Sequence, residues 1–515
     1  MAMKRMLFLL AGVCLLSSFS PEPAVLDDIC TMMDDDVFKA YCYEHFDTDQ
    51  DGKVSLDEAS EIYSLEVSGL GLKSLTGMQY FGNLGILYCY NNNLTSLDLS
   101  RNLNLAHVYC SDNKLTELIV GRHPTLEVLS CGKNCLESLD VSNASALSCL
   151  YCEYNQISSL NVSKNSELIL LSCDNNLLTS LDVSFNAKLT SLSCNGNQIS
   201  ILDVSKNPEL NVLGAKDNQL MALDVRNNPK LAYLVLGGNE IAGIDLGNNP
   251  ELCALSIEKN QLARLDLSLN PNLEYLAIDN NYLTDVYFGY NPLLGELSCS
   301  GNRFYILDLS KNDKLHTLNC DRNKLTAIDV SNNKILYKFS CANNLLTELN
   351  LAENTELVSL KCDGNRIVKL DLSNNVYLEH LSCSNNSLMS LDVKKNVLLK
   401  SLICDNNILT SLDIVINGLQ CLVCSNNNLA SLDLSGQMSL TQLSCSSNQL
   451  TSLDLTDCRD LSVLVCTSNQ LKTLDVSNNK ELTVLFCDDN PMETIIVGNR
   501  IPDIYYPSQA IINYL

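Results

Sequence analysis

One stretch of the sequence has the residue types and spacing of a calcium-binding loop. Residues 47–58 read Asp-Thr-Asp-Gln-Asp-Gly-Lys-Val-Ser-Leu-Asp-Glu, which fits the EF-hand pattern D-x-[DN]-x-[DN]-G-x5-E in full. Calcium takes about six to eight hard oxygen ligands, and alternate positions of such a loop can supply them. The predicted ligands are the carboxylates of Asp47, Asp49, Asp51 and Glu58, the backbone carbonyl of Lys53 and, through a water molecule, Ser55.

This loop lies between two predicted helices. Apolar residues recur at helical spacing over 34–46, and a short second helix is expected over 56–63. Gly52 should make the sharp turn and Val54 should point inward. EF-hands usually occur in pairs but only one loop is present, so we expect it to fasten the N-terminal end of the protein rather than to sense calcium. The alternative is an acidic turn that merely resembles an EF-hand.

The combination of residues needed for catalysis is missing from the sequence. It contains five His, and the nearest candidate base for Cys149 is His107, two repeats away. Strand spacing puts that pair about 10 Å apart, beyond hydrogen-bond reach for a nucleophile and its base. No glycine-rich phosphate loop is present either. We therefore expect a protein that is not an enzyme.

A single repeat fills most of the chain and must position any functional residue. Its consensus is LxxLxCxxNxLTxLDVSxNxx, with Leu at position 1 and Asn at position 9 in every copy. A fixed period of this length predicts a solenoid in which each coil packs on its neighbours. The twenty copies lie 21 residues apart, with one step a residue shorter, and begin at Leu84, Leu105, Leu126, Leu147, Leu168, Leu189, Leu210, Leu231, Leu252, Leu273, Leu294, Leu315, Leu336, Leu357, Leu378, Leu399, Leu419, Leu440, Leu461 and Leu482.

The alternation within one repeat predicts where its strands lie. Positions 4 and 6 should face inward on a short strand, with positions 3, 5 and 7 outward. The second half of the repeat resembles the first, so positions 14 and 16 should form another strand. With strands on both sides, we expect a flattened, gently curved or twisted rod rather than a tight horseshoe. The Asn at position 9 should bind backbone groups of adjacent coils, because buried backbone groups need partners.

Cysteine recurs at position 6 of the repeat. Ala215, Leu236, Ile257 and Ile278 take this position in the middle coils, so cysteine acts there as a small apolar residue and we expect free buried thiols. Stacked disulfides, for which the parallel side chains have poor geometry, and a metal site are the alternatives. Of the 24 cysteines, sixteen occupy this position: Cys89, Cys110, Cys131, Cys152, Cys173, Cys194, Cys299, Cys320, Cys341, Cys362, Cys383, Cys404, Cys424, Cys445, Cys466 and Cys487.

Two sets of outward residues could meet ligands. Asp occupies position 15 in most repeats, and Ser at position 17 with nearby backbone N–H groups are its expected partners; a cation-binding face is the alternative. On the first strand, Tyr gives a rigid apolar body with a polar tip, which suits a protein or glycan ligand. Alternatively, Tyr is simply a good residue for an exposed strand. The predicted ligand-binding residues of this first-sheet face are Tyr88, Tyr90, His107, Tyr109, Tyr151 and Tyr154.

The consensus is the leucine-rich repeat signature. Together with the EF-hand-like loop, the stretch from Asp34 to about Gly498 resembles the secreted leucine-rich repeat proteins of gut and oral bacteria, internalin-like in the broad sense. The resemblance implies an extracellular protein that binds a partner or forms part of a surface.

The N-terminus and the charge agree with export. Lys4 and Arg5 precede an apolar run over 6–16 that is too short to span a membrane, as in a signal peptide. Lipidation at Cys14 is disfavoured because Val13 before it is bulky. The net charge is −26, from 34 basic and 60 acidic residues, with no basic stripe for nucleic acid. We expect a secreted or surface protein without a transmembrane segment.

These observations predict four parts of a mainly β protein. They are a signal peptide (1–20), an EF-hand-like cap with a half-formed repeat (21–83), a leucine-rich repeat solenoid (84–498), and a C-terminal cap rich in Ile and Tyr (499–515) that folds over the last coil. The expected function is non-catalytic protein binding or adhesion, with a cap stabilised by Ca²⁺. A structural or self-assembling surface component is the alternative.

Overall fold

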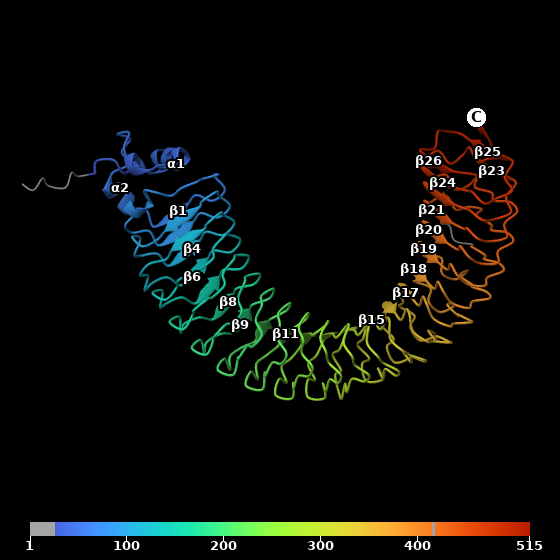
Figure 1. Ribbon diagram of the computed structural model, residues 1–515, viewed down its shortest axis with the longest axis horizontal. Coiled ribbons are helices and arrows are strands. Elements are labelled where there is room, and N and C mark those ends of the chain that lie inside the picture. Colours follow the sequence, from blue (N-terminus) through green and yellow to red (C-terminus); the bar gives the residue numbers. More distant parts are fainter. Residues whose placement is uncertain (1–25, 415–417, 515) are drawn as a thin grey trace, which may run out of the picture.

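The computed structural model describes residues 26–414 and 418–514, which form one continuous arc of stacked coils (Figure 1). The predicted signal peptide and Cys14 lie outside these residues. Helices occur only near the N-terminal end of the described chain: η1 (Ile29–Met32), α1 (Asp36–Phe46), α2 (Leu56–Ser60) and η2 (Met78–Tyr80). None of the helices in the described chain is both long and apolar enough to cross a bilayer. The continuous stack of coils confirms the predicted leucine-rich repeat solenoid.

One parallel sheet of 22 three-residue strands follows the concave side of the arc (Figure 1). Equivalent positions pair from coil to coil, as Leu192 does with Leu213. The strands are β1 (Ser64–Glu66), β2 (Ile86–Tyr88), β4 (His107–Tyr109), β6 (Val128–Ser130), β7 (Cys149–Tyr151), β8 (Leu170–Ser172), β9 (Ser191–Ser193), β10 (Val212–Gly214), β11 (Tyr233–Val235), β12 (Ala254–Ser256), β13 (Tyr275–Ala277), β14 (Glu296–Ser298), β15 (Thr317–Asn319), β16 (Lys338–Ser340), β17 (Ser359–Lys361), β18 (His380–Ser382), β19 (Ser401–Ile403), β20 (Cys421–Val423), β21 (Gln442–Ser444), β22 (Val463–Val465), β24 (Val484–Phe486) and β26 (Asp503–Tyr505).

The core is a continuous column of leucine and cysteine side chains. The leucines at positions 1 and 4 are buried, and all sixteen cysteines at position 6 have no exposed surface. No described cysteine forms a disulfide bond. Burial raises the pKa of Cys194 to about 12, so this thiol is protonated and unreactive at neutral pH.

The asparagine at position 9 binds adjacent coils together, as expected. The residue before it has a positive φ in every repeat, and in the coil that begins at Leu168 this residue is Asn175 (φ 52°). The next residue, Asn176, accepts a hydrogen bond from Ile157 N of the preceding coil at 3.0 Å. Its amide nitrogen donates to Cys152 O at 3.0 Å and to Cys173 O at 3.2 Å. Each coil therefore satisfies backbone groups of the coil before it.

A second asparagine column, at position 19, joins the coils on the outer side. Asn186 donates to Val162 O at 3.0 Å and to Asn165 O at 2.8 Å, both in the preceding coil. Its Oδ1 is buried and has no hydrogen-bond partner, a feature repeated along the column. The position-19 amides thus act as donors only, in contrast to those at position 9.

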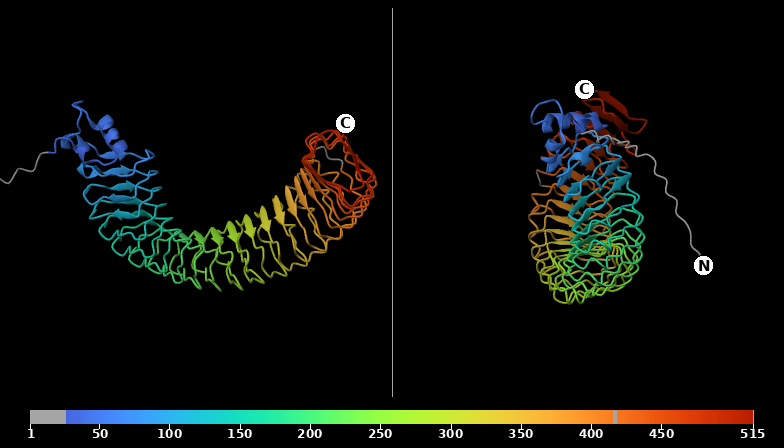
Figure 2. Two further views of the ribbon diagram at one scale, coloured as in Figure 1. Left: turned by 45° about the horizontal axis from the view of Figure 1, so that its top comes forward. Right: turned by 90° about the vertical axis from the view of Figure 1, so that its left-hand side faces the viewer.

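The expected outer strands form only in parts of the array. Among the described residues, the outer pairings are β3 (Ser96–Asp98) with β5 (Glu117–Ile119), β25 (Thr494–Val497) between β23 (Thr473–Val476) and β27 (Ile511–Tyr514), and two isolated bridges. Elsewhere the outer side has no strand ladder. Because strand pairing is continuous on one side only, the stack bends toward that side into an open arc (Figures 1 and 2). The expected gently curved rod is therefore corrected to a strongly curved arc.

Asp at position 15 forms a local turn on the outer side. Its carboxylate accepts the N–H two residues ahead, as Asp182 does from Ser184 N at 2.9 Å. Asp98, Asp266 and Asp475 make this turn and still pair with Ile119, Tyr287 and Ile496 of the next coil, so the turn does not exclude strand pairing. The position-15 carboxylates therefore have the structural partners expected from the sequence.

The C-terminal tail covers the last repeat by adding strands to it, and the residues at the inward positions 4, 6, 14 and 16 of that repeat are at most 1% exposed. In this arrangement β26 pairs in parallel with β24, and β27 pairs in parallel with β25. Residues 499–514 therefore continue the solenoid by one more short coil.

Candidate functional site

The predicted calcium loop lies between α1 and α2, and three of its predicted ligands converge. Carboxylate oxygens of Asp47, Asp49 and Glu58 all lie within 4.8 Å of one another. Two oxygens that bind one calcium ion at about 2.3–2.6 Å lie no more than about 5 Å apart, so this donor set fits the ion. Asp51, Lys53 and Ser55 follow on the same loop but are not part of that three-residue cluster.

Backbone N–H groups hold the loop in shape. Asp47 accepts from Asp51 N at 3.1 Å and from Gly52 N at 2.9 Å, and Gly52 has the positive φ (86°) that the sharp turn requires. Glu58 accepts hydrogen bonds from Ser55 N at 2.8 Å and from Thr48 N at 2.7 Å. These donors lower the pKa of Glu58 to about 2, and Ser55 N has the larger effect. The carboxylate is therefore ionised at neutral pH.

The N-terminal segment supplies the backbone partner that a second EF-hand usually provides. Ile29 N donates to Val54 O in the loop at 2.9 Å, and Val54 N donates to Asp28 Oδ1 at 3.2 Å. The Lys53 side chain also pairs with Asp27. Val54 itself is fully buried. A single loop can therefore be held in this fold without a paired loop.

Helix α1 connects the loop to the repeats. Asp35, at its N-cap, accepts from Val37 N and Phe38 N and also from Lys73 N, at 2.7 Å, in the capping half-repeat. At its other end Phe46 packs edge-on against Phe81, with 5.5 Å between ring centroids. Changes in the loop can therefore reach the end of the array through α1.

The predicted ligand residues lie on the first strands of the concave sheet. Tyr88 on β2 and Tyr109 on β4 stack with 4.9 Å between ring centroids and 4° between ring planes. Tyr151 lies two strands further, on β7, because Ser130 on β6 intervenes. Burial, and to a smaller extent the neighbouring Tyr88, raises the pKa of Tyr109. Its hydroxyl therefore remains a hydrogen-bond donor at neutral pH. We call Tyr88, Tyr90, His107, Tyr109, Tyr151 and Tyr154 the tyrosine patch.

The remaining members of the patch lie beside or beyond these strands. His107 Nε2 is 3.7 Å from Glu127 Oε2, so its nearest acidic neighbour is a residue that the sequence analysis did not single out. Tyr90 and Tyr154 are 44% and 54% exposed. Tyr154 has φ 55°, in the left-handed region that Gly and Asn adopt most easily. A bulky exposed ring is thus held at a conformationally unfavourable position.

Acidic residues surround the tyrosine patch. Glu66 on β1 and Glu127, directly before β6, are exposed, and Asp112 pairs with Lys133 at 3.3 Å. Glu153 leans over Gly132, where an added Cβ would lie 2.6 Å from Glu153 Oε1. Glu153 Oε2 is buried and has no hydrogen-bond partner. The field over the patch is therefore negative.

Other acidic residues of the concave edge are bound within the protein. Asp174 accepts from Ser193 Oγ at 2.7 Å and from Asn195 N at 2.6 Å, both in the next coil. Asp279, Asp321 and Asp363 make the equivalent pair of bonds. These carboxylates join coils and are less free to bind a ligand than Glu66 or Glu127.

Two C-x2-C pairs in the repeats do not form metal sites. Cys149 and Cys421 lie at position 3 and are partly exposed, whereas Cys152 and Cys424 lie at position 6 and are buried. Each pair therefore lies on opposite faces of its strand, too far from convergence for one ion. The one group of three or more potential metal ligands in the described chain is the calcium loop.

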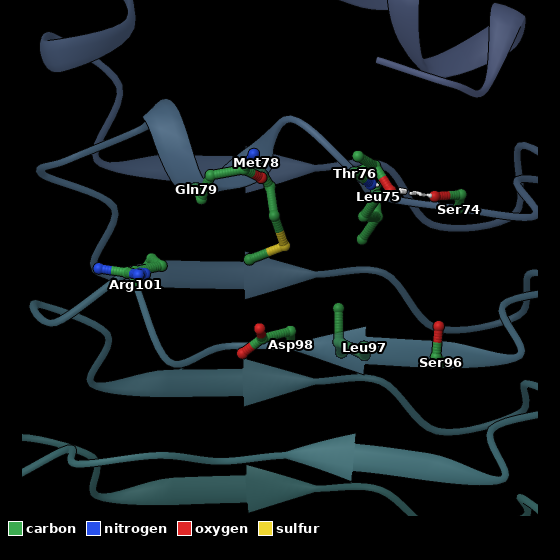
Figure 3. A pocket seen from close by; sticks show the side chains of 9 residues that line it. All are labelled: Ser74, Leu75, Thr76, Met78, Gln79, Ser96, Leu97, Asp98 and Arg101. Carbon is green, nitrogen blue, oxygen red and sulfur yellow. Dashed lines mark hydrogen bonds between the residues drawn. The ribbon is translucent and has the colours of Figure 1, made fainter. Parts of the chain in front are cut away.

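A cavity of about 370 Å³ lies away from both predicted sites, between the half-repeat and β3 (Figure 3). Buried Leu75, Met78 and Leu97 line its floor, and Asp98 and Arg101 lie at its edge. It forms where the chain before η2 does not pair with β3. The lining residues belong to the half-repeat and the first coil. The cavity therefore lies at the junction of the cap and the solenoid and includes none of the predicted ligand residues.

Comparison with solved structures confirms the fold. The chain is similar to YopM from Yersinia enterocolitica WA-314, with 25% identity and a TM-score of 0.67 over 89% of this chain and 92% of that one. It is also similar to the functional domain of InlJ from Listeria monocytogenes, described as including a cysteine ladder, with 25% identity and a TM-score of 0.50 over 87% and 82%.

A third similar structure is a plant receptor. It is the Arabidopsis receptor kinase HAESA in complex with the peptide hormone IDA and the co-receptor SERK1, with 20% identity and a TM-score of 0.60 over 85% of this chain and 84% of that one. No protein-family model matches the chain. No curated protein matches it in sequence. These likenesses place the chain among leucine-rich repeat solenoids, whose members include protein-interaction and receptor domains.

Proposed function

We propose that this protein is an exported, non-catalytic recognition protein that binds a peptide or protein ligand on the tyrosine patch. The observation that carries the proposal is the stacked pair Tyr88–Tyr109 on the concave sheet, extended by exposed Tyr90 and Tyr154. Aromatic side chains are enriched at the energetically dominant centres of interfaces. Similar solenoids bind peptides, as HAESA binds IDA, which supports a ligand of this class.

The charges around the patch favour a ligand segment that carries Lys or Arg. Glu66 and Glu127 offer exposed carboxylates beside the patch. Tyrosine faces also attract cations, as Arg303 over Tyr282 at 4.6 Å illustrates elsewhere in this protein. Binding should therefore weaken as salt increases.

A panned peptide library tests this proposal. A displayed random-peptide library is selected on the full chain in calcium buffer, and enriched peptides are then measured against the Tyr88→Ala/Tyr109→Ala/Tyr151→Ala variant. The matched control is Tyr275→Ala, a 41% exposed tyrosine on the same sheet. We expect basic peptides that lose at least about tenfold in affinity with the triple variant and keep it with the control. Peptides that bind the triple variant equally well contradict the proposal, and enrichment on a glycan array instead identifies a glycan ligand.

We further propose that the loop from Asp47 to Glu58 binds one Ca²⁺ ion and stabilises the cap. The carboxylates of Asp47, Asp49 and Glu58 supply converging hard oxygens, and Asp51, the Lys53 carbonyl and Ser55 complete the loop pattern. Four carboxylates on one short loop repel one another, and a divalent cation would remove that repulsion. Through Asp35 and Phe46 the ion would stabilise the first coil as well.

Calorimetry and thermal unfolding test the calcium proposal on the full chain. We expect binding of one ion per chain and a lower unfolding temperature for the cap when a chelator removes it. Glu58→Gln should abolish both effects, whereas Asp57→Asn, at the adjacent exposed residue, should keep them. An unfolding temperature that is the same with chelator and with calcium contradicts the proposal.

Export is tested separately by locating the mature protein. Expressed with its leader in a bacterial host, the chain should be recovered outside the cytoplasm with a new N-terminus soon after residue 20. Replacement of the apolar run over 6–16 by polar residues should leave it in the cytoplasm. Recovery of the intact leader outside the cell would argue against cleavage.

A further inference from the structure

The last coil of the described chain covers the repeat before it but leaves its own inward residues partly exposed. In the last full repeat the inward positions 4, 6, 14 and 16 are Leu485, Cys487, Ile495 and Val497, with at most 1% exposure. In the short coil that follows, the residues in register with them are Ile504, Tyr506, Ile512 and Tyr514. Tyr506 and Tyr514 are 39% and 67% exposed, and both isoleucines are only partly buried. The N-terminal end differs, because α1 and Phe81 cover it.

Two strand edges lie at this C-terminal end. β26 pairs only with β24, and β27 pairs only with β25, so each is the last strand of its sheet in the described chain (Figure 1). Unpaired strand edges carry free N–H and C=O groups and readily accept another strand. Asp503 is the one charged residue in these two strands, and residues 504–514 contain none.

Each of the two strand edges can pair with the same edge of a second copy of the chain. The chain crosses the coil in opposite directions on its two sides, so β26 and β27 run antiparallel to each other. A two-fold axis through the end face, perpendicular to the strands and to the solenoid axis, then places β26 antiparallel to its own copy and β27 antiparallel to its own copy. One symmetry operation satisfies both edges and closes the assembly. Because pairing centred on Ile504 places Asp503 opposite Tyr505 of the second copy, the two Asp503 carboxylates do not face each other.

We propose that this C-terminal face binds a second copy of the chain, tail to tail. Two chains of net charge −26 repel, so the favoured contact is through these strands, which carry one charged residue and leave Tyr506 and Tyr514 exposed. The concave sheets then continue across the interface, and the tyrosine patches lie at the two far ends. This proposal is independent of the proposed ligand, since no residue of the tyrosine patch takes part in it.

Light scattering after size exclusion of the full chain in calcium buffer tests the dimer. We expect twice the chain mass, and a dissociation constant at least about tenfold weaker for Tyr514→Lys and for Ile511→Lys, whose side chains are 67% and 64% exposed. The controls are Ile201→Lys and Ile306→Lys, which are 78% and 76% exposed in the middle of the array and should leave the dimer unchanged. Circular dichroism confirms that each variant is folded.

Three outcomes would overturn the proposal. The first is a wild-type protein that stays monomeric at high concentration. The second is lysine variants at residues 511 and 514 that dimerise as tightly as wild type. The third is a mass that grows without limit, because an open assembly does not have the two-fold closure that the strand directions require.

Discussion

Loss of one position-9 asparagine should weaken the solenoid more than loss of one position-19 asparagine. In Asn176→Ala, the buried Ile157 N–H loses its acceptor, and no other acceptor replaces it. Cys152 O and Cys173 O lose one donor each but keep another, from Asn155 at 3.1 Å and Asn197 at 3.0 Å. An orphaned buried donor costs about 1–3 kcal/mol and each lost neutral bond about 0.5–1.5 kcal/mol, so the expected loss is roughly 2–6 kcal/mol.

The comparison variant is Asn186→Ala, in the position-19 column. It removes two donated hydrogen bonds, to Val162 O and Asn165 O, but leaves no N–H without an acceptor because Oδ1 has no partner. Both carbonyls also keep a backbone donor. The expected loss is about 1–3 kcal/mol. The two columns look alike in sequence, so this difference comes only from their contacts.

Hydrogen exchange is the suitable assay, because a long repeat array need not unfold in one step. The amide of Ile157 should exchange roughly a hundredfold faster in Asn176→Ala, which corresponds to about 3 kcal/mol. Asn176→Asp keeps the acceptor for Ile157 N but sets a carboxylate oxygen against two carbonyls, so it should destabilise while this amide stays protected longer. If Ile157 exchange is unchanged in Asn176→Ala, or if Asn186→Ala costs as much, the reasoning is refuted.

Three other predictions follow from the same structure. In the folded protein a hydrophilic maleimide should modify the four partly exposed cysteines, Cys135, Cys149, Cys253 and Cys421. Mass spectrometry identifies the modified residues, and rapid modification of the position-6 cysteines would contradict their burial. The Ser184 hydroxyl and N–H lower the pKa of Asp182, as equivalent donors do along position 15. The stability that these carboxylates add is therefore present above about pH 4 and is lost as the pH falls through their lowered pKa values. Urea midpoints measured against pH test this expectation, and midpoints that do not change with pH exclude it. His123 occupies position 19, where its side chain makes one hydrogen bond, to Leu99 O at 2.8 Å, and its Nδ1 has no partner. His123→Asn should stabilise the protein by about 1 kcal/mol because the amide can donate a second hydrogen bond. An unchanged free energy of unfolding in urea would contradict this prediction.

Local patterns in the sequence were sufficient for much of the structure. The convergence of Asp47, Asp49 and Glu58 could be predicted because these residues lie within twelve positions, and the position-9 column because every coil repeats one contact. The tyrosine patch followed from strand alternation, which fixes which side chains face outward. Stacking of Tyr88 on Tyr109 needed only that their coils be adjacent.

Contacts without a period could not be predicted. The segment that supports the calcium loop, Asp28–Ile29, contacts Val54 about 25 residues away, and nothing in its composition signals this pairing. Similarly, the Ile and Tyr content of the tail predicted that it covers the last coil, but it did not predict how. The register with β24 and β25 shows that the tail does so as one more short coil, whose own apolar residues are only partly buried.

The curvature of the arc follows from a difference between the two halves of the repeat that the apolar pattern does not show. Both halves alternate alike, so hydrophobic periodicity assigns a strand to each, yet in the described chain only the first half forms a continuous sheet. On the outer half, Asp at position 15 accepts the N–H of position 17, as Asp182 does from Ser184. Asp98 makes the same turn within β3, where Leu99 N donates to Ile119 O of the next coil at 2.9 Å, so the turn by itself does not exclude an outer strand. The acidic column that first suggested a cation-binding face is therefore explained by its hydrogen bonds within the protein, whereas the bend follows from the continuous sheet on one side alone.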